Sequence, residues 1–484
     1  MSEGFAEVAG VEVSTDHYIG GERVGSGQSF ATHSPIDQSL LAEVARAGAD
    51  EVDAAVRAAH GAFPAWASLG AAGRAEHLHR LADLIDANVD RLAAVECADM
   101  AMLLRSLRAR VIGRGARNYR AYADLAVGYE ERDWHSVGTW NRVQRMPAGP
   151  AAVITPWNAP FMLSTWKTAP ALAAGCTVVL KPAEWSPLSC SLLAQLAHEA
   201  GLPAGVFNVV QGIGEEAGAA LVAHPLIRRV SFTGSVPTAR HIGQAAAGNI
   251  VPFTAELGGK NPLIVFADAD LDAAARKAAG QYDDAGQVCL SGTRLLVEEP
   301  VRAEFLERFH AAVDEQVLGD PRQDATTISP LIHPDHLARV DGFVQRARDE
   351  GQTIVRGGSS PGGLFYEPTL IEPASNDAEI VQNEVFGPVL TIQSFGDEDE
   401  AVALANSTDY GLAGIVYTTS LGRADRVGRA IRAGIVWVNT FLVRDLTAPF
   451  GGMGISGIGR EGGDSALDFY SDLKTLQILE GSVQ

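Results

Sequence analysis

The sequence is poor in cysteine, in basic residues and in long apolar runs. Four cysteines among 484 residues show no CxxC spacing and no accompanying histidine pair. This argues against a disulfide scaffold and a zinc finger, and it favours a reducing compartment with no metal site. Lysine and arginine number 38 against 59 aspartates and glutamates, a formal net charge of -21. Because such a surplus repels phosphate backbones, nucleic acid is not expected as a partner.

No segment has the features of a membrane span or of a targeting signal. The uncharged stretch most worth testing, residues 146–166, contains Pro147, Pro150 and Pro156, which would break a helix repeatedly in lipid. The first ten residues carry two glutamates, and they show neither a basic start nor an apolar run. We therefore expect a cytoplasmic protein with no membrane partner.

The remaining pattern is typical of a folded α/β chain. Apolar residues make up 46% of the chain and charged residues 20%, which predicts more than one folded domain. Residues 17–24 (HYIGGERV) have the pattern of a hairpin, and residues 49–124 repeat apolar positions at helical spacing. From residue 151, β-branched runs alternate with alanine-rich segments at intervals of about 25 residues, which predicts βαβ units and a parallel sheet. Residues 257–439 alternate similarly and predict a second α/β domain.

Two segments fall outside these patterns. Residues 127–144 (VGYEERDWHSVGTWNRVQ) are polar and aromatic without a regular period, which indicates an excursion that pairs with another subunit. The C-terminal residues 468–484 include an apolar alternation at Leu476 and Ile478, which is typical of an edge strand lying on another sheet.

The residues that could carry chemistry are ambiguous when taken singly. Cys289 lies in GQVCLSGTR, where a cysteine is more often a buried apolar residue than a nucleophile. Glu256 lies between an apolar run and two glycines, which favours neither a catalytic nor a structural role. Two segments match GxGxxG, Gly452–Gly457 and Gly457–Gly462, but no strand directly precedes them. We therefore interpret both as decoys and not as phosphate-binding loops.

Eight motifs taken together are far more specific than any one of them. In chain order they are TPWNAP (155–160), LKPAEWSP (180–187), FTGS (232–235), ELGGKNP (256–262), GQVC (286–289), NEVFGPV (383–389), GIVWVN (434–439) and PFGGMGISGIGREGG (449–463). In these motifs, and over essentially its whole length, the chain resembles the aldehyde dehydrogenase superfamily. The segment around Arg444 looks like the branch that acts on hydroxymuconic semialdehydes.

The resemblance implies an α/β fold with three parts. A Rossmann-type NAD-binding domain would cover residues 1–123 and 148–256, and a second α/β catalytic domain would cover residues 257–458. Residues 124–147 and 459–484 would form a small β oligomerisation element and tail in a homodimer or homotetramer. The chain also departs from the family. Residues 99–103 read DMAML where many members carry Gly-Lys-Pro, and Gly454 replaces the usual lysine; neither position holds a reacting group.

The implied activity is NAD-dependent oxidation of an aldehyde to a carboxylic acid. Cys289 resembles the nucleophile, whose attack makes an oxyanion that the amide of Asn158 and the backbone N–H of Cys289 would stabilise. Hydride loss to the nicotinamide would leave a thioester, and Glu256 resembles the base that activates water to hydrolyse it. Lys181 completes the predicted catalytic set and belongs to the cofactor set as well.

The cofactor implied by the resemblance is NAD. The residues expected to bind it are Thr155, Pro156, Trp157, Lys181, Glu184, Gly234, Ser235, Leu257, Glu384 and Phe386. Glu184, together with Lys181, would hold the adenosine ribose and repel a 2′-phosphate, which favours NAD over NADP. A structural alternative is that Glu184 only caps a helix N-terminus. Gly234 and Ser235 would lie near the pyrophosphate, although the family's usual second glycine is Ala239 here.

The expected partner is a small aldehyde. The residues expected to line its tunnel are Ala159, Leu163, Trp166, Tyr282, Val288, Leu290 and the segment 442–446. Arg444 either pairs with the carboxylate of a semialdehyde, such as 2-hydroxymuconic semialdehyde from aromatic ring cleavage, or pairs with Asp445 or another acid as a structural ion pair. Arg110, Arg114 and Arg117 share one helical face, which is typical of a solvated surface and is also able to recruit an anion.

Other activities stay open at the level of the sequence. The enzyme would instead oxidise neutral aromatic or aliphatic aldehydes if Arg444 is structural. A CoA-acylating relative would not need Glu256 as a base for water. A cofactor-independent thiol esterase would use Cys289, Asn158 and Glu256 without NAD, whereas a scaffold that had lost the chemistry would not need these residues.

Overall fold

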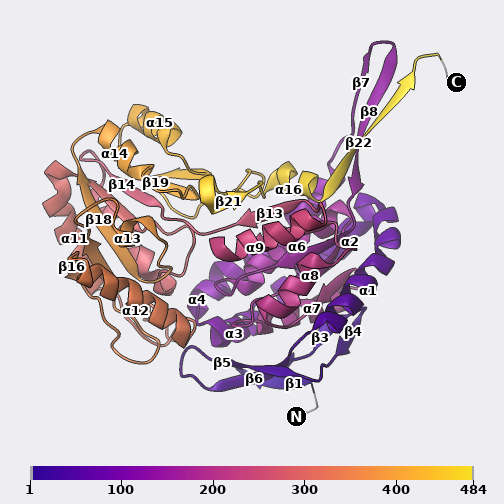
Figure 1. The fold of residues 1–484 in the computed structure, drawn as a ribbon, viewed down its shortest axis with the longest axis horizontal. Coiled ribbons are helices and arrows are strands. Elements are labelled where there is room, and N and C mark those ends of the chain that lie inside the picture. The colour runs from indigo at the N-terminus through magenta and orange to yellow at the C-terminus, as the bar shows by residue number, and fades with distance from the viewer. Residues whose placement is uncertain (1–3, 482–484) are drawn as a thin grey trace.

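The computed structural model describes residues 4–481, and an eight-stranded sheet forms its first framework (Figure 1). The strand order is β21 (Gly457–Ile458), β13 (Phe253–Glu256), β12 (Arg229–Thr233), β9 (Pro150–Ile154), β10 (Thr177–Lys181), β11 (Phe207–Val209), β3 (His17–Ile19) and β4 (Glu22–Val24). Strands β13, β12, β9, β10 and β11 are parallel. The predicted parallel sheet and the predicted hairpin β3–β4 are therefore confirmed.

Both faces of this sheet are covered by helices. Along β9, Ala151 and Val153 pack into one hydrophobic core, and the alternate residues Ala152 and Ile154 pack into another. This follows from the two-residue period of a strand, and it explains why the strand reads as a continuous apolar run. The helices on the first side are α2 (Gly70–Ala87), α3 (Val89–Met100), α5 (Ile112–Val127), α6 (Pro160–Ala174) and α7 (Leu188–Glu199). Those on the other side are α1 (Ala49–Ser68), α8 (Ala219–Ala223) and α9 (Val236–Gly248).

The register of the parallel strands aligns their carboxyl ends. Lys181 at the end of β10 pairs with Ile154, and Thr233 at the end of β12 pairs with Glu256. Because these ends meet at one edge of the sheet, the residues that follow each strand face the same crevice. This edge is where the sequence motifs place their polar side chains.

A seven-stranded sheet forms the second framework. Its order is β16 (Thr353–Arg356), β17 (Thr369–Glu372), β18 (Val389–Phe395), β15 (Arg294–Glu298), β14 (Pro262–Val265), β19 (Ala413–Tyr417) and β20 (Ile435–Val438). Its helices are α10 (Leu271–Ala279), α11 (Arg302–Asp314), α12 (Pro334–Asp349), α13 (Glu379–Gln382), α14 (Glu398–Ala405) and α15 (Leu421–Ala430). The predicted α/β fold class with a second α/β unit is confirmed.

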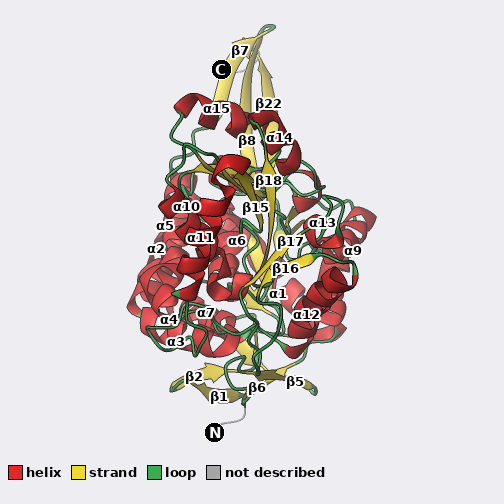
Figure 2. Cartoon of the chain, turned by 90° about the vertical axis from the view of Figure 1, so that its left-hand side faces the viewer, coloured by secondary structure: helices red, strands yellow, loops and turns green. Residues whose placement is uncertain are grey.

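A three-stranded arm extends away from both sheets (Figures 1 and 2). Its strands are β7 (Arg132–Ser136), β8 (Thr139–Pro147) and β22 (Ser471–Leu479), with β8 in the centre. The C-terminal strand therefore pairs with the excursion that interrupts the α/β pattern in the sequence. Two smaller hairpins, β1 (Phe5–Val8) with β2 (Val11–Ser14) and β5 (Ser29–His33) with β6 (Leu40–Ala45), lie near the N-terminus (Figure 2).

Three of the expected domain boundaries differ from the bounds of the elements in the structure. Residues 124–127 form the last turn of α5, so the arm begins only at β7. Strand β21 pairs with β13 and thus belongs to the first sheet, although residues 457–458 were expected in the catalytic domain. Helix α16 (Gly463–Phe469) contributes Ala466 and Leu467 to the core of the first unit, so only β22 joins the arm. Predicted bounds at residues 1 and 484 lie outside the described residues.

Short irregular helical turns complete the chain. They are α4 (Leu104–Ser106), η1 (Leu107–Val111), η2 (Gly214–Gly218), η3 (Gly280–Gly286), η4 (Glu299–Val301) and η5 (Gly454–Ser456). Within residues 4–481, no helix combines the length and the apolar character that a bilayer crossing requires.

The turn between β1 and β2 offers a test of local backbone strain. Ala9 and Gly10 both have positive φ (51 and 76), and a side chain added at Gly10 would meet nothing within 4 Å. Because asparagine tolerates the left-handed region better than alanine, Ala9→Asn should slow amide exchange in β1 and β2 about two- to fivefold. The Gly10→Ala variant is the matched control and should speed exchange. Hydrogen exchange read by mass spectrometry measures both, and equal rates in the two variants would contradict the strain.

Candidate active site

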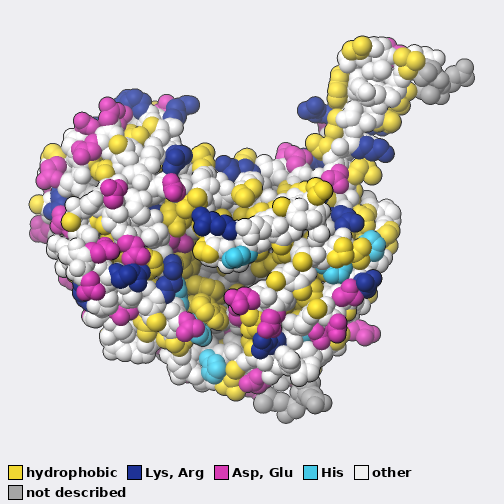
Figure 3. All heavy atoms as spheres, in the orientation of Figure 1, with side chains coloured by type: hydrophobic (Ala, Val, Ile, Leu, Met, Phe, Trp, Pro, Cys, Tyr) yellow, Lys and Arg dark blue, Asp and Glu magenta, His cyan; other side chains and the backbone are white. Residues whose placement is uncertain are grey.

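A cavity of about 530 Å³ lies where the aligned strand ends of the first sheet face the second unit. The surface is hollowed there between α9 and α12 (Figure 3). The cavity brings together predicted residues from distant segments, namely Pro156, Trp157, Asn158, Leu163, Gly234, Ser235, Glu256, Leu257, Cys289, Glu384 and Phe386. It also includes residues that the sequence reasoning missed, among them Trp185, Thr233, His336, Arg339, Phe343 and Tyr410. Most of the missed residues lie on helices and loops outside the quoted motifs, so no local pattern marks them.

Cys289 lies in the loop between η3 and β15, and Asn261 fixes this loop from the neighbouring strand β14. The Asn261 Nδ2 donates to the carbonyl oxygens of Cys289 (2.8 Å) and Ser291 (2.9 Å), and its Oδ1 accepts from Ala413 N. A Cβ at Gly259 would lie 2.9 Å from the Cys289 carbonyl oxygen. Glycine at 259 therefore allows the loop to approach, and asparagine at 261 holds it there.

Asn158 is oriented by the same loop. It ends the segment between β9 and α6, and its Nδ2 donates to the carbonyl of Gln287 at 2.9 Å. That bond uses one amide hydrogen and leaves the second for another acceptor beside Cys289. Ala159 follows Asn158 as the N-cap residue of α6, and Pro160 at the first position fixes the start of the helix.

Glu256 ends β13 in a closely packed glycine environment. The side chain is 7% exposed, and no described residue forms a hydrogen bond with its Oε2 atom. A Cβ at Gly451 would lie 2.8 Å from Glu256 Oε1, and Gly457 pairs with Glu256 across β21. The glycine-rich segment thus serves close packing against this carboxylate, in agreement with its interpretation as a decoy for phosphate binding.

The pKa values at this position are strongly perturbed. Burial raises the pKa of Glu256 well above its usual range, and the negative charge of Glu461 raises it further, whereas Lys167 and Arg444 oppose the shift. Glu461 accepts hydrogen bonds from Lys167 Nζ and Trp166 Nε1. Burial raises the pKa of the Cys289 thiol to about 12, with further contributions from Glu384 and Glu256. A carboxylate of raised pKa beside a thiol is suited to general-base chemistry.

Groups that fit a dinucleotide lie in the cavity and beside it. Lys181 Nζ bonds Glu184 Oε2 at 3.0 Å, directly after β10. Ser235 caps α9 by accepting from Thr238 N, which leaves a helix N-terminus facing the cavity. The Thr233 Oγ1 atom is buried with no hydrogen-bond partner among the described residues, so a ligand hydroxyl or phosphate has a donor to use.

Glycines allow the Glu384 side chain to approach the backbone closely on this side of the cavity. A Cβ at Gly258 would lie 2.1 Å from Glu384 Oε2, and the Glu384 carboxylate accepts from Gly259 N at 3.0 Å. Burial raises the pKa of Glu384 to about 7. Phe386 lies edge-on to Trp157, at 5.3 Å between ring centroids. Ala239, the departure from the family pattern, is a buried residue of α9 that packs in the core.

Three predicted cofactor residues, Thr155, Lys181 and Glu184, lie outside the cavity lining. Thr155 is buried, and its hydroxyl bonds Ser164 at 3.0 Å. Lys181 is 2% exposed, and none of its described contacts reaches Cys289, Glu256 or Asn158. The pairing with Glu184 supports the cofactor assignment of Lys181 and gives no support to its place in the catalytic set.

Two arginines from distant segments converge on Trp166. The guanidinium carbon of Arg114, on α5, lies 5.5 Å from the Trp166 ring centroid, and that of Arg444 lies 5.3 Å from it. Arg444 also stacks on Phe450 at 3.6 Å and interacts electrostatically with Glu256 and Cys289. No ion pair to either arginine is found among residues 4–481. Asp445 instead accepts from Thr447, so the predicted pair of Arg444 with Asp445 does not form. The acids that act electrostatically on Arg444 are Glu256 and Glu461.

Other substrate residues are placed less directly. Tyr282 is a correction, because its side chain is fully buried in the second core and its hydroxyl donates to the Thr369 carbonyl. Leu290 is 8% exposed in the same core, and Val288 packs against it. Arg110 and Arg117 are exposed as expected of a solvated face, whereas Arg114 is half-buried and turns toward Trp166.

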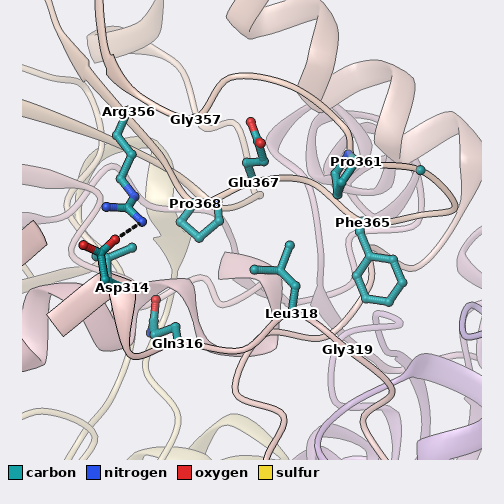
Figure 4. A pocket seen from close by; sticks show the side chains of 12 residues that line it. Asp314, Gln316, Leu318, Gly319, Arg356, Gly357, Pro361, Phe365, Glu367 and Pro368 are labelled. Atoms are coloured by element: carbon teal, nitrogen blue, oxygen red, sulfur yellow. Dashed lines mark hydrogen bonds and ion pairs between the residues drawn. The ribbon is translucent and has the colours of Figure 1, made fainter. Parts of the chain in front are cut away.

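A second cavity, of about 640 Å³, lies beyond α11 and is lined by none of the predicted residues (Figure 4). Its charged side chains Arg356 and Asp314 already pair with each other at 2.6 Å. The chemistry therefore points to the cavity at Cys289.

The comparisons with known proteins agree with this geometry. The family model described as "Aldehyde dehydrogenase family" matches residues 23–476. The chain belongs to the aldehyde dehydrogenase family. The resemblance inferred from the motifs is thus confirmed. The family match gives no support to a cofactor-independent thiol esterase.

Individual members of the aldehyde dehydrogenase family are similar over nearly their full lengths. The 2-hydroxymuconic semialdehyde dehydrogenase of Pseudomonas sp. (strain CF600) is 43% identical over 95% of this chain and 98% of that protein. The betaine aldehyde dehydrogenase of Rhizobium leguminosarum is 38% identical over 97% and 98%. The solved indole-3-acetaldehyde dehydrogenase from P. syringae, in complex with NAD+ and IAA, has a TM-score of 0.95 at 38% identity and covers 97% of each chain. NAD, the cofactor implied by the motifs, is the one bound in that structure.

The raised thiol pKa predicts how Cys289 reacts with alkylating agents. Only the thiolate is nucleophilic, so alkylation by iodoacetamide without added cofactor should accelerate about tenfold per pH unit across the neutral to mildly alkaline range, without a plateau. Mass spectrometry of the Cys289 peptide gives the rate, and the buried Cys97, Cys176 and Cys190 are internal controls. A rate that is half-maximal at about pH 8.5 and levels off above about pH 9.5 would show an ordinary thiol and contradict the shift.

Proposed function

We propose that this protein is an NAD-dependent dehydrogenase that oxidises a carboxylated semialdehyde, of the 2-hydroxymuconic type, to the corresponding dicarboxylic acid. The observation that carries the substrate assignment is the pair of guanidinium groups, Arg114 and Arg444, that stack on Trp166 and form no ion pair with an acidic side chain among the described residues. Arg444 also lies near enough to Cys289 to act on it electrostatically. The similarity to 2-hydroxymuconic semialdehyde dehydrogenases supports the same assignment.

The first half of the reaction uses the Cys289 loop and Asn158. The Cys289 thiol loses its proton to water, and the thiolate formed attacks the aldehyde carbon. The free amide hydrogen of Asn158 together with the backbone N–H of Cys289 stabilises the oxyanion. Loss of one such donor typically lowers the rate about a hundredfold or more. Bound NAD would supply the hydride acceptor, held by Lys181, Glu184 and Glu384. Cys289 then carries a thioester.

The second half uses Glu256. Its buried carboxylate removes a proton from water, and the hydroxide formed attacks the thioester and releases the acid and the Cys289 thiol. Glu461 and burial together keep the Glu256 pKa raised, so the carboxylate is a stronger base than one in water.

The arginine pair would bind the distal carboxylate of the substrate. A carboxylate between two guanidinium groups forms charge-assisted hydrogen bonds and removes the repulsion between the two cations. That repulsion is visible in the pKa of Arg114, which burial and Arg444 lower to about 10. A neutral aldehyde leaves the repulsion in place, and a cationic aldehyde adds to it.

A series of aldehydes of different charge tests this function. With NAD, kcat/KM is expected to fall from 2-hydroxymuconic semialdehyde to benzaldehyde to betaine aldehyde. The Arg444→Ala variant should raise KM for the semialdehyde about ten- to a hundredfold and change KM for benzaldehyde by less than about threefold. NADH absorbance measures all rates. Equal effects on both substrates would overturn the carboxylate assignment and leave a dehydrogenase of neutral aldehydes.

The role of Glu256 is tested separately by transient kinetics. The Glu256→Gln variant should still form NADH in a burst of about one equivalent per active site and then turn over slowly, because acylation of Cys289 precedes the water step. Stopped-flow absorbance at the NADH band reads both phases. A normal steady-state rate would remove Glu256 from the mechanism, and the Cys289→Ala variant, expected to give no burst, is the control.

We further propose that the arm formed by β7, β8 and β22 makes the protein a homo-oligomer. The outer strands each pair with β8 alone, and the arm carries exposed apolar side chains, including Trp134, Val137 (98% exposed) and Leu476. Hydrophobic side chains are visible on the arm in Figure 3. An extended edge of this kind is normally covered by another chain.

The oligomeric state is measured directly by light scattering coupled to size exclusion. A dimer or tetramer is expected for the natural chain, and Leu476→Glu should shift it toward monomer because it places a charge in the interface. Lys474→Gln, an exposed residue on the same face of β22, is the matched control and should leave the assembly intact. A monomeric natural chain would refute the proposal.

We also propose a reducing, cytoplasmic location, because all four cysteines are unpaired. Fractionation of the producing cells tests it, and recovery outside the cytoplasm would contradict it.

A further inference from the structure

Helices α5 and α6 approach unusually closely beside the arginine pair. A Cβ at Gly115 would lie 2.6 Å from Phe161 Cε1 and 3.2 Å from Thr165 Cγ2. Because a real side chain would not fit, glycine at 115 lets the two backbones come together. This contact brings Asn118 of α5 within hydrogen-bond reach of Thr165 of α6.

A directed chain of hydrogen bonds runs through this contact to Arg114. Thr165 Oγ1 donates its single proton to the Met162 carbonyl (2.8 Å), so it faces Asn118 as an acceptor. Asn118 Nδ2 therefore donates to Thr165 Oγ1 (3.0 Å), which leaves Asn118 Oδ1 to accept from Arg114 Nε (2.9 Å). Asn118 and Thr165 are fully buried. The donor and the acceptor of each of these three hydrogen bonds are therefore fixed, and only this orientation of the Asn118 amide offers Arg114 an acceptor.

We propose that Asn118 and Thr165 are positioning residues that hold the Arg114 guanidinium over Trp166 and thereby set the preference for carboxylated over neutral aldehydes. The proposal rests on the proposed function, since it assumes that Arg114 binds the substrate carboxylate. Neither residue touches the substrate. They act by restricting a long, flexible side chain that Arg444 repels.

The geometry explains why the restraint is needed. Within residues 4–481, the one hydrogen bond of the Arg114 side chain joins its Nε to Asn118, so its terminal nitrogens stay available for a carboxylate. Without that bond, repulsion from Arg444 favours rotation of Arg114 toward solvent on a helix whose neighbouring Arg110 and Arg117 are exposed. A preorganised guanidinium loses less freedom when substrate binds.

The test replaces threonine by valine, which has a similar volume, at two positions of α6. Thr165→Val removes the acceptor for Asn118 and is expected to raise KM for 2-hydroxymuconic semialdehyde about five- to tenfold, with kcat and the KM for benzaldehyde changed by less than about twofold. Thr165→Ser keeps the hydroxyl and should restore the natural KM ratio. Thr168→Val is the structural control, because it removes another buried bond between the same helices, to Tyr119 OH at 2.8 Å, without touching Arg114. An equal change in the Thr168→Val variant would reduce Thr165 to a packing role.

A second variant keeps the test decisive if Thr165→Val does not fold. Asn118→Asp places a carboxylate beside Arg114 and should raise the semialdehyde KM more than Thr165→Val, because the guanidinium then has an internal partner. An unchanged KM ratio in this variant would overturn the proposal.

Arg114→Ala separates failure of the positioning from failure of the proposed function. One outcome is that Arg114→Ala raises KM for the semialdehyde, whereas Thr165→Val and Asn118→Asp leave it unchanged. The positioning role is then refuted, and the substrate assignment stands. If Arg114→Ala affects semialdehyde and benzaldehyde equally, Arg114 does not bind the carboxylate and both ideas fail at this residue.

Discussion

The site depends on one contact, the return of strand β21 to pair with β13. At that point the chain, having built the second sheet, pairs Gly457 with Glu256 and places Gly451 against the same carboxylate. The hydrogen bond from Leu257 N to the Ser456 carbonyl closes the contact. Because β21 pairs with β13 inside the first sheet, the chain that leaves the second sheet is anchored beside Glu256 by backbone bonds. A Cβ at Gly451 would lie 2.8 Å from Glu256 Oε1 and one at Gly457 would lie 2.7 Å from the Ala255 carbonyl oxygen, so a larger residue at either position would disturb this contact.

Low exposure at this contact makes each charge influence several others. Glu461, Lys167 and Arg444 lie close enough to act on the pKa of Glu256, and Glu256 and Glu461 act on that of Arg444. Water does not screen these charges as it would at the surface. Arg444 favours the ionised forms of Glu256 and Cys289, and in the proposed function it also binds the substrate carboxylate. Substrate binding would then change the field at the nucleophile and at the base, since a bound anion offsets the positive charge of Arg444.

Much of the fold and of the reacting centre was predictable from the sequence because those features are local. The two-residue period of the strands and the glycines of the β3–β4 turn are read directly from neighbouring residues. The family motifs placed Cys289, Glu256 and Asn158, and the cavity brings these three together. The incorrect predictions concern side chains whose environment is decided by tertiary packing. Tyr282 is near Cys289 in the sequence, yet it points into the core, and Arg114 looked like one residue of a solvated face.

The sequence by itself determined the strand and helix pattern, the family and the candidate residues that line the cavity, because each of these depends on short segments of neighbouring residues. Only the tertiary structure decided which distant side chains share an environment. Arg114 and Arg444 are separated by most of the chain, and they meet on Trp166 because Gly115 lets α5 approach α6 and because β21 returns to the first sheet. His336 and Arg339 of α12 also reach the cavity through tertiary packing, and no motif in the sequence of that helix predicts their position. No local pattern encodes such meetings, since they depend on how whole elements pack.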